Sequence, residues 1–268
     1  MPAGIPKGYE PMRVTSQTTS NGVSELLFTL DDITGVLWSP ADATGSRPLV
    51  LLGHGGGQHK KAPGLMTRAR RYVTACGFAV AAIDAPGHGD RPKVERYERL
   101  MADIRQRVAH GEALGAHIAR YNVVLAEQAV PEWQATLDTV AELDLAGGPV
   151  GYWGNSMGGA IGLPLVAAEP RITAAVFGLC GHETLTNAAG RITVPVELLL
   201  QWDDEMVPRD AGLALFDAFA SREKTLHANL GGHGGVPAFE LESAERFFTR
   251  HLLEAGAPAE VTESRRSP

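Results

Sequence analysis

A serine at the centre of a short glycine-rich motif is the first candidate for chemistry in this chain. Residues 154–158 are Gly-Asn-Ser-Met-Gly, so Ser156 stands in the pattern G-x-S-x-G. An apolar run, residues 150–153, precedes the motif, and small residues follow it. A serine on a sharp strand-to-helix turn is pushed out above the sheet, where its hydroxyl can attack a carbonyl carbon. Ser156 is therefore a candidate nucleophile, although the same motif also occurs as a plain turn of small residues.

A nucleophilic serine needs a base, and His233 is the histidine best placed to act as one. It lies in a glycine-rich stretch, residues 230–235, between the last apolar run and the last helical pattern. Such a loop can hold an imidazole over the rim of a sheet. In contrast, His227 falls inside a strand-like run and His251 inside the last helical pattern, so both are expected to pack or to face solvent.

Three neighbouring carboxylates compete to be the acid that orients this histidine. Asp203, Asp204 and Glu205 follow the apolar run 194–200, and Pro208 opens the next helical pattern. A strand end can bring a carboxylate to the imidazole, whereas an acidic residue near a helix start can simply complement the helix dipole. Residue type and position do not separate Asp203 from Asp204.

Two backbone N–H groups are expected to bind the oxyanion formed in such an attack. One belongs to Met157, directly after the serine, and the other to a loop that follows an earlier strand. Residues 53–59, Gly-His-Gly-Gly-Gly-Gln-His, form that loop, with Gly56 as the expected donor. Because glycines let the backbone approach a substrate closely, Gly55 and Gly57 are candidate pocket residues. The loop lacks the G-K-[ST] ending and the helix-opening G-x-G-x-x-G of phosphate-binding loops.

Three further side chains are candidates for the substrate pocket. Arg91, at the end of loop 84–91, could meet an anionic group, although a solvated surface arginine is the simpler interpretation. Trp153 and Trp202 could line an acyl pocket, although buried aromatic residues more often belong to the core. His88, in the same loop as Arg91, is interpreted as part of a structural turn.

The histidines and cysteines do not predict a metal site. No H-E-x-x-H motif and no Cys/His cluster is present, and His54 is expected to brace the glycine-rich loop by hydrogen bonds. Cys76 and Cys180 do not form a disulfide framework and are interpreted as buried free thiols. We therefore expect neither a metal nor a cofactor.

Apolar runs alternating with helical patterns predict the elements that must position these residues. Strands are expected at 24–30, 33–39, 49–52, 78–83, 150–153, 174–179 and 194–200, with a weaker one at 224–230. Helices are expected at 64–76, 133–144, 157–168, 209–220 and 239–254. Alternation of this kind indicates an α/β fold with a mostly parallel central sheet and helices on both faces. The first two strands, joined at Asp31-Asp32, are expected to form an antiparallel hairpin, and residues 1 to about 20 are polar and irregular.

Residues 92–130 interrupt this alternation. They hold helical periodicity but no strand pattern, as in Tyr97, Leu100, Met101 and Ile104. A long insertion just before the nucleophile strand is typical of a helical cap over the site, although the helices could instead cover one edge of the sheet. The whole chain, 1–268, is expected to form a single domain that contains this insertion and ends in a disordered tail at 256–268.

Composition narrows the class of protein further. With 44% hydrophobic and 21% charged residues, the chain is typical of a globular protein with a sizeable core. A net charge of −7 without a basic patch argues against a nucleic-acid partner. The N-terminus lacks the apolar core of a signal peptide, and no apolar run reaches the length of a membrane span, so a cytoplasmic location is expected. Apolar cap residues such as Tyr97 and Met101 could equally contact a second subunit in a homodimer.

Taken in order, these motifs resemble those of the α/β-hydrolase superfamily, within it the dienelactone-hydrolase-like and small carboxylesterase branches. The resemblance covers about residues 48–254 and rests on segments 54–57, 84–89, 154–158, 201–208 and 232–233. Members of these branches carry G-x-x-D-x-x-V-P at the acidic strand end, which implies that Asp204 is the acid. Gln201 departs from that pattern, because glycine is usual there.

The resemblance implies a serine hydrolase that cleaves a small-molecule carboxylic ester through an acyl-enzyme. Dienelactone hydrolases use cysteine as nucleophile, so the serine favours ester hydrolysis. Other acyl chemistry on the same residues, namely peptide or amide, thioester or C–C hydrolysis or acyl transfer, is the alternative. A further alternative is a binding protein of this fold without catalytic activity. The complete set of serine, histidine and aspartate candidates disfavours that alternative.

Overall fold

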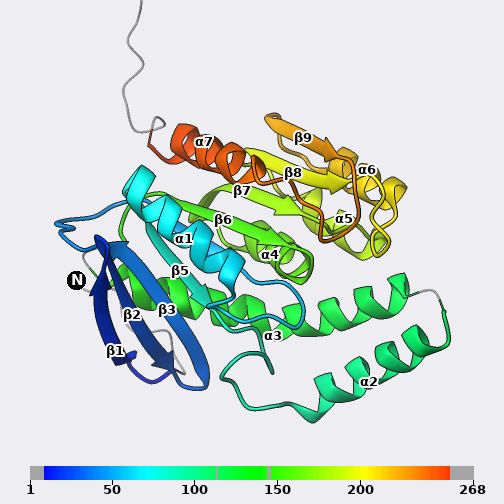
Figure 1. The fold of residues 1–268 in the computed structure, drawn as a ribbon, viewed down its shortest axis with the longest axis horizontal. Helices are drawn as coiled ribbons and strands as arrows, with labels where there is room; N and C mark the ends of the chain where they lie inside the picture. Colours follow the sequence, from blue (N-terminus) through cyan, green and yellow to red (C-terminus); the bar gives the residue numbers. More distant parts are fainter. Residues whose placement is uncertain (1–8, 113, 144–145, 254–268) are drawn as a thin grey trace, which may run out of the picture.

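A nine-stranded sheet runs through the protein, as seen in a computed structural model that describes residues 9–112, 114–143 and 146–253 (Figure 1). The strand order is β1-β2-β3-β5-β4-β6-β7-β8-β9, antiparallel from β1 to the β3–β5 pair and parallel from β5 to β9. The strands are β1 (Arg13–Ser20), β2 (Val23–Leu30), β3 (Ile33–Pro40), β4 (Leu49–Gly53), β5 (Ala79–Ile83), β6 (Val150–Asn155), β7 (Ile172–Gly178), β8 (Val196–Gln201) and β9 (Lys224–Asn229). The α/β-hydrolase fold predicted from the sequence is confirmed.

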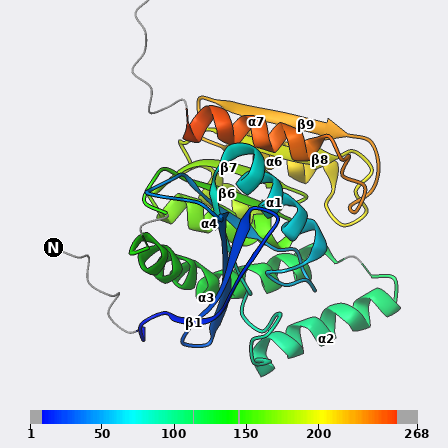
Figure 2. The same ribbon diagram turned by 60° about the vertical axis from the view of Figure 1, so that its left-hand side comes forward.

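Helices cover both faces of this sheet, as predicted. The helices are α1 (Pro63–Cys76), α2 (Glu95–Ala109), α3 (Gly115–Ala141), α4 (Met157–Ala168), α5 (Glu183–Ala189), α6 (Arg209–Ala218) and α7 (Glu240–Leu252). Helices α1 and α7 pack together on one face, and α3, α4, α5 and α6 form a continuous layer on the other (Figures 1 and 2). Strands β4 and β5 are buried along their whole length because helices cover both of their faces.

The sequence patterns did not predict two of the elements. Strand β1 pairs with β2 at the sheet edge, whereas residues up to about 20 were expected to be irregular. All eight of its residues are exposed, so no buried face imposes an apolar alternation on them. Helix α5 has seven residues, which is too short for helical periodicity to be visible.

The helices of the 92–130 segment differ from the prediction in one respect. Two helices were expected after residue 115, one ending near 130 and one beginning at 133, but α3 runs without interruption from Gly115 to Ala141. Pro131, which stands between the two expected helices, lies inside α3. The first half of α3 lies beside α2, away from the sheet, and the second half packs on α4 (Figures 1 and 2). The predicted tail, 256–268, lies outside the described residues.

Across the described ranges, we find no helix that combines the length and the apolar character needed to span a membrane.

Candidate active site

The backbone at Ser156 is held in a strained turn between β6 and α4. Its φ of 55° and ψ of −121° lie in a region that residues with a side chain rarely adopt. Glycines make the turn possible, because a Cβ at Gly154 would lie 2.6 Å from Gly158 O, and one at Gly158 would lie 2.4 Å from Gly53 O. The Ser156 N–H donates to Gly178 O at 2.8 Å, which ties the turn to β7. The hydroxyl is thereby presented above the sheet rim.

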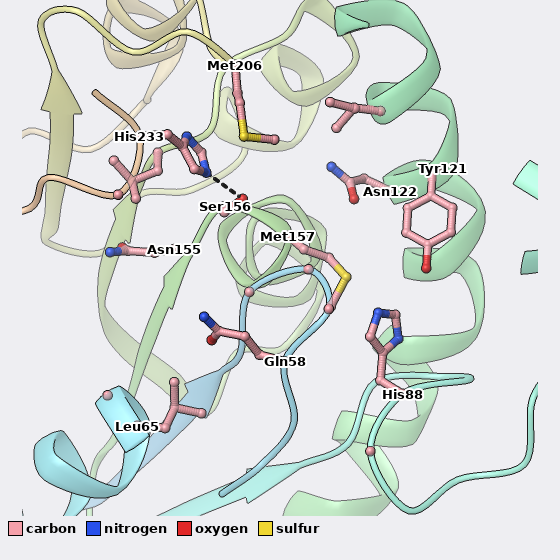
Figure 3. Close-up of a pocket in the computed structure, with 18 of the residues that line it drawn as sticks. Gln58, Leu65, His88, Tyr121, Asn122, Asn155, Ser156, Met157, Met206 and His233 are labelled. Carbon is pink, nitrogen blue, oxygen red and sulfur yellow. Dashed lines mark hydrogen bonds between the residues drawn. The ribbon is translucent and has the colours of Figure 1, made fainter. Parts of the chain in front are cut away.

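His233 reaches this hydroxyl from the loop between β9 and α7 (Figure 3). Its Nε2 atom lies 3.0 Å from Ser156 Oγ, and its Nδ1 atom lies 2.8 Å from Asp204 Oδ2. The side chain of Asp204, which follows β8, is buried, and its Oδ1 accepts backbone N–H bonds from Met206 and Val207 at 2.8 and 2.9 Å. The three residues therefore form one continuous hydrogen-bonded chain from carboxylate to hydroxyl.

The three competing carboxylates have three different partners. Asp204 bonds the imidazole, whereas Glu205 Oε2 accepts the backbone N–H of His233 at 2.9 Å and Asp203 Oδ2 accepts that of Gly231 at 3.2 Å. The N–H of His233 lowers the pKa of Glu205. Glu205 and Asp203 thus hold the loop that carries the imidazole, a role that local sequence reasoning did not distinguish from that of the acid.

Gln201 also holds this loop. Its Nε2 lies 3.3 Å from Gly232 O and 3.5 Å from Leu230 O, so the side chain bridges the end of β8 to the histidine loop. The side chain is buried. The residue that departs from the glycine usual in similar proteins therefore provides a contact that glycine would lack.

The glycine-rich loop after β4 is oriented by His54. The backbone N–H of Ala85 donates to His54 Nε2 at 3.0 Å, so the proton is on Nδ1, which donates to Gly55 O at 2.9 Å. Burial lowers the pKa of His54 to about 4, which keeps the ring neutral. Gly55 O also accepts from Gln58 N, so the N–H of Gly56 points the opposite way across the trans peptide. An ideal Cβ on Gly56 would lie 4.0 Å from Met157 Cβ, which places this N–H donor beside the start of α4.

Ser156 and His233 stand where two cavities meet. The larger, about 1000 Å³, extends from the glycine-rich loop to α2 and α3, and the smaller, about 160 Å³, lies against α5 and α6. Helix residues across the larger cavity include Tyr121 and Asn122 of α3. In Figure 3, the Asn122 amide points toward Ser156, whereas the Tyr121 hydroxyl points toward His88. The larger cavity is lined by Gly55, Gly56, Gly57, Trp153 and Met157, among others. The smaller is lined mainly by small and apolar residues such as Ala160, Leu179, Leu185 and Ala211.

Two of the candidate pocket residues lie elsewhere. Arg91 is buried, neither in the cavity nor at the surface, because its guanidinium bonds both oxygens of Glu132 at 2.6 and 2.8 Å and Asp32 at 2.9 Å. Trp202 is 38% exposed, and the Arg209 guanidinium stacks 3.9 Å from its ring. Neither residue lines the two cavities, so both were wrong as pocket predictions. The partners of Arg91 lie 41 and 59 residues away in the chain, too far for local pattern reasoning to identify.

Other lining residues were not found from the sequence. His88, interpreted as part of a turn, bonds Pro86 O through Nδ1 at 3.0 Å but also lines the larger cavity. Arg68 of α1 stacks 4.0 Å from the Trp153 ring in the wall of the same cavity, and Met206 lines both cavities. Arg68 belongs to no motif, so only the helical spacing of α1 could have indicated that it turns inward. Met206 lies within the 201–208 motif, but at a variable position that predicts no contact with a substrate.

Comparisons with known proteins extend these observations. The family Hydrolase_4, described as serine aminopeptidase, S33, matches residues 44–181, which include Ser156 but neither Asp204 nor His233. Among solved structures, a PEG-bound complex of a novel cold-adapted esterase from an Arctic intertidal metagenomic library is 35% identical, with a TM-score of 0.72. The alignment covers 89% of this chain and 98% of that one.

More distant structures share the fold. An acetyl xylan esterase from Paenibacillus sp. R4 is 17% identical, with a TM-score of 0.70, over 92% of this chain and 90% of that one. A dienelactone hydrolase from Anabaena variabilis ATCC 29413 is 20% identical, with a TM-score of 0.55, over 90% of this chain and 98% of that one. No curated protein matches this chain.

Proposed function

Since this chain belongs to the Hydrolase_4 family of α/β hydrolases, and is thus a hydrolase, we propose that it cleaves carboxylic esters with Ser156 as nucleophile, His233 as base and Asp204 as orienting acid. The observation that carries the proposal is the unbroken chain of hydrogen bonds from Asp204 through His233 to Ser156, at the junction of two cavities. The 35% identical esterase supports ester rather than amide hydrolysis.

In the first half-reaction, Ser156 Oγ attacks the ester carbonyl carbon while His233 Nε2 takes the hydroxyl proton. Asp204 keeps the Nδ1 proton in place and stabilises the imidazolium that forms. The N–H groups of Met157 and Gly56 bind the oxyanion; loss of one such donor costs about 3 kcal/mol of barrier. The Met157 N–H is free for this role because the first N–H groups of a helix have no acceptor within the helix. Collapse of the intermediate breaks the bond to the alkoxide, which takes the proton from His233.

In the second half-reaction, water replaces the alcohol. His233 Nε2 takes a proton from the water, whose oxygen attacks the acyl carbon, and then returns the proton to Ser156 Oγ as the carboxylic acid leaves. The cycle consumes only the ester and water.

The unequal cavities favour esters with a small group on one side of the scissile bond. A volume of about 160 Å³, lined by small and apolar residues, suits a short chain, whereas about 1000 Å³ admits a bulky group. We expect activity to fall steeply along one of two ester series, either with acyl length at constant alcohol or with alcohol size at constant acyl group. Equal tolerance in both series would contradict this arrangement.

The segment 92–130 is proposed to act as a cap. Tyr97, Met101 and Ile104 of α2 and Tyr121 of α3 line the larger cavity on the side away from the sheet. Exchange of these side chains is therefore expected to change substrate preference while leaving the serine, histidine and aspartate in place.

Labelling with a fluorophosphonate tests the nucleophile. The reagent should label the wild-type protein at Ser156 alone, stop ester turnover in the same proportion, and leave Ser156→Ala unlabelled. A panel of acyl esters, lactones, thioesters and amides, assayed with both proteins, tests the bond type. Label at another residue refutes the nucleophile, and Ser156-dependent turnover of amides with none of esters refutes ester hydrolysis.

A further inference from the structure

Three ionisable side chains gather on the α7 face of the sheet, outside the residues of the active site. Glu197 lies on β8, His227 on β9, and Glu240 is the first residue of α7. One nitrogen or oxygen from each lies within 4.8 Å of the other two. Both carboxylates are almost fully buried, with side-chain exposures of 5% for Glu197 and 2% for Glu240.

The imidazole of His227 is oriented by one carboxylate and faces the other. Its Nδ1 lies 2.9 Å from Glu240 Oε2, and Asn229 Nδ2 donates to Glu240 Oε1 at 2.9 Å, so both oxygens of Glu240 are occupied. On its opposite side, His227 Nε2 lies 3.7 Å from Glu197 Oε2. The Oε1 atom of Glu197 is buried and has no hydrogen-bond partner in the part of the chain that the structure describes.

A proton or a metal cation between His227 Nε2 and Glu197 Oε2 would complete this arrangement. A neutral His227 that donates its Nδ1 proton to Glu240 has a lone pair on Nε2. That lone pair faces the Glu197 carboxylate. A metal cation provides a positive charge there and also gives the unpartnered Glu197 Oε1 atom a partner.

We propose that Glu197 and His227 Nε2 bind a divalent transition-metal ion of the zinc class, with Glu240 holding the imidazole through Nδ1. Two ligand atoms 3.7 Å apart can share an ion at roughly 2.1 Å from each, the distance zinc takes to nitrogen and oxygen. A carboxylate bonded to the far nitrogen of a ligating histidine is the usual partner in such sites. His227 is 25% exposed, so water reaches the remaining coordination positions.

The site has no motif because its residues come from three separate elements. Glu197 and His227 project from the same face of adjacent strands, since Glu197 pairs with Thr225 and Leu199 with His227. Imidazole with carboxylate favours zinc, cobalt or nickel over magnesium, which prefers oxygen ligands alone. The ion would bind outside the proposed active site, so this inference does not depend on ester hydrolysis.

Thermal unfolding of the whole protein, first stripped with EDTA and then titrated with ZnCl2, tests the site. Zinc at ten times its dissociation constant should raise Tm by about 3–6 °C, and magnesium should leave it unchanged. The shift should be lost in Glu197→Gln and in His227→Gln. It should persist in His110→Gln, an exposed histidine after α2, and in His233→Gln, which removes the active-site imidazole.

Absence of a zinc shift in wild type, or its loss in His233→Gln with retention in Glu197→Gln, would overturn the proposal. If Glu197→Gln or His227→Gln does not fold, anomalous scattering from wild-type crystals grown with ZnCl2 decides the matter. A zinc peak between Glu197 and His227 supports the site. Zinc peaks that are found only at other positions refute it.

Discussion

Replacing Asp204 by asparagine should inactivate the enzyme by exchanging the tautomer of His233. Asp204 Oδ1 accepts the N–H groups of Met206 and Val207 at 2.8 and 2.9 Å, so the amide oxygen of an asparagine must take that position. Its NH2 group then occupies the place of Oδ2, 2.8 Å from His233 Nδ1, and donates to it. The ring proton moves to Nε2, which faces Ser156 Oγ at 3.0 Å without a lone pair to accept the hydroxyl proton.

The expected loss is about 10⁴-fold in kcat, or about 5 kcal/mol of barrier, because the histidine can no longer act as base. Asp203→Asn is the matched control, since Asp203 Oδ2 accepts the N–H of Gly231, at 3.2 Å and in an exposed position, and does not contact the imidazole in the described part of the chain. Steady-state hydrolysis of p-nitrophenyl acetate measures both variants, and thermal unfolding checks that both are folded. A loss in Asp203→Asn equal to that in Asp204→Asn, or a folded Asp204→Asn with more than a tenth of wild-type kcat, would refute the reasoning.

Three further substitutions test the surroundings of the site. Arg91→Ala should lower the free energy of unfolding by about 3–5 kcal/mol in urea titration, since it leaves the buried Glu132 carboxylate without its charged partner; a raised KM with unchanged stability would instead place Arg91 in substrate binding. Gly158→Ala should destabilise by about 1–3 kcal/mol despite the better helix propensity of alanine, because its Cβ would lie 2.4 Å from Gly53 O; a stabilised variant contradicts that close contact. Because the pKa of His54 is lowered to about 4 in the folded state, the unfolded chain binds the proton first as pH falls below about 6.5. Stability should therefore be lost toward pH 4, by up to about 3 kcal/mol more in wild type than in His54→Gln, and parallel pH profiles of the two proteins would disprove a neutral buried ring.

The fold was largely predictable because its signals are local. Each parallel strand is a short apolar run, and such a run needs only its own residues to indicate burial on both faces. Predictions failed where structure arises without that signal. Strand β1 has no buried face, and α3 continues through Pro131, which local rules place at a helix end.

The candidate site divides in the same way. Ser156 and the glycine-rich loop depend on neighbours in the chain, since the turn geometry requires glycine at specific nearby positions. The choice among Asp203, Asp204 and Glu205 depends on a loop about 30 residues later, where each acid finds a different donor. From the residues alone this choice stayed open, and resemblance to similar proteins was needed to favour Asp204.

By itself, the sequence determined the strand-turn-helix around the serine, the order of the chemical groups and the α/β class, because these follow from contacts between near neighbours. Only the tertiary structure decided the partners of charged groups. It buried Arg91 against Glu132, separated the three acids by their donors, and brought Glu197, His227 and Glu240 together. The physical reason is that a buried charge must find a partner wherever the fold provides one, and the distance along the chain does not limit that choice.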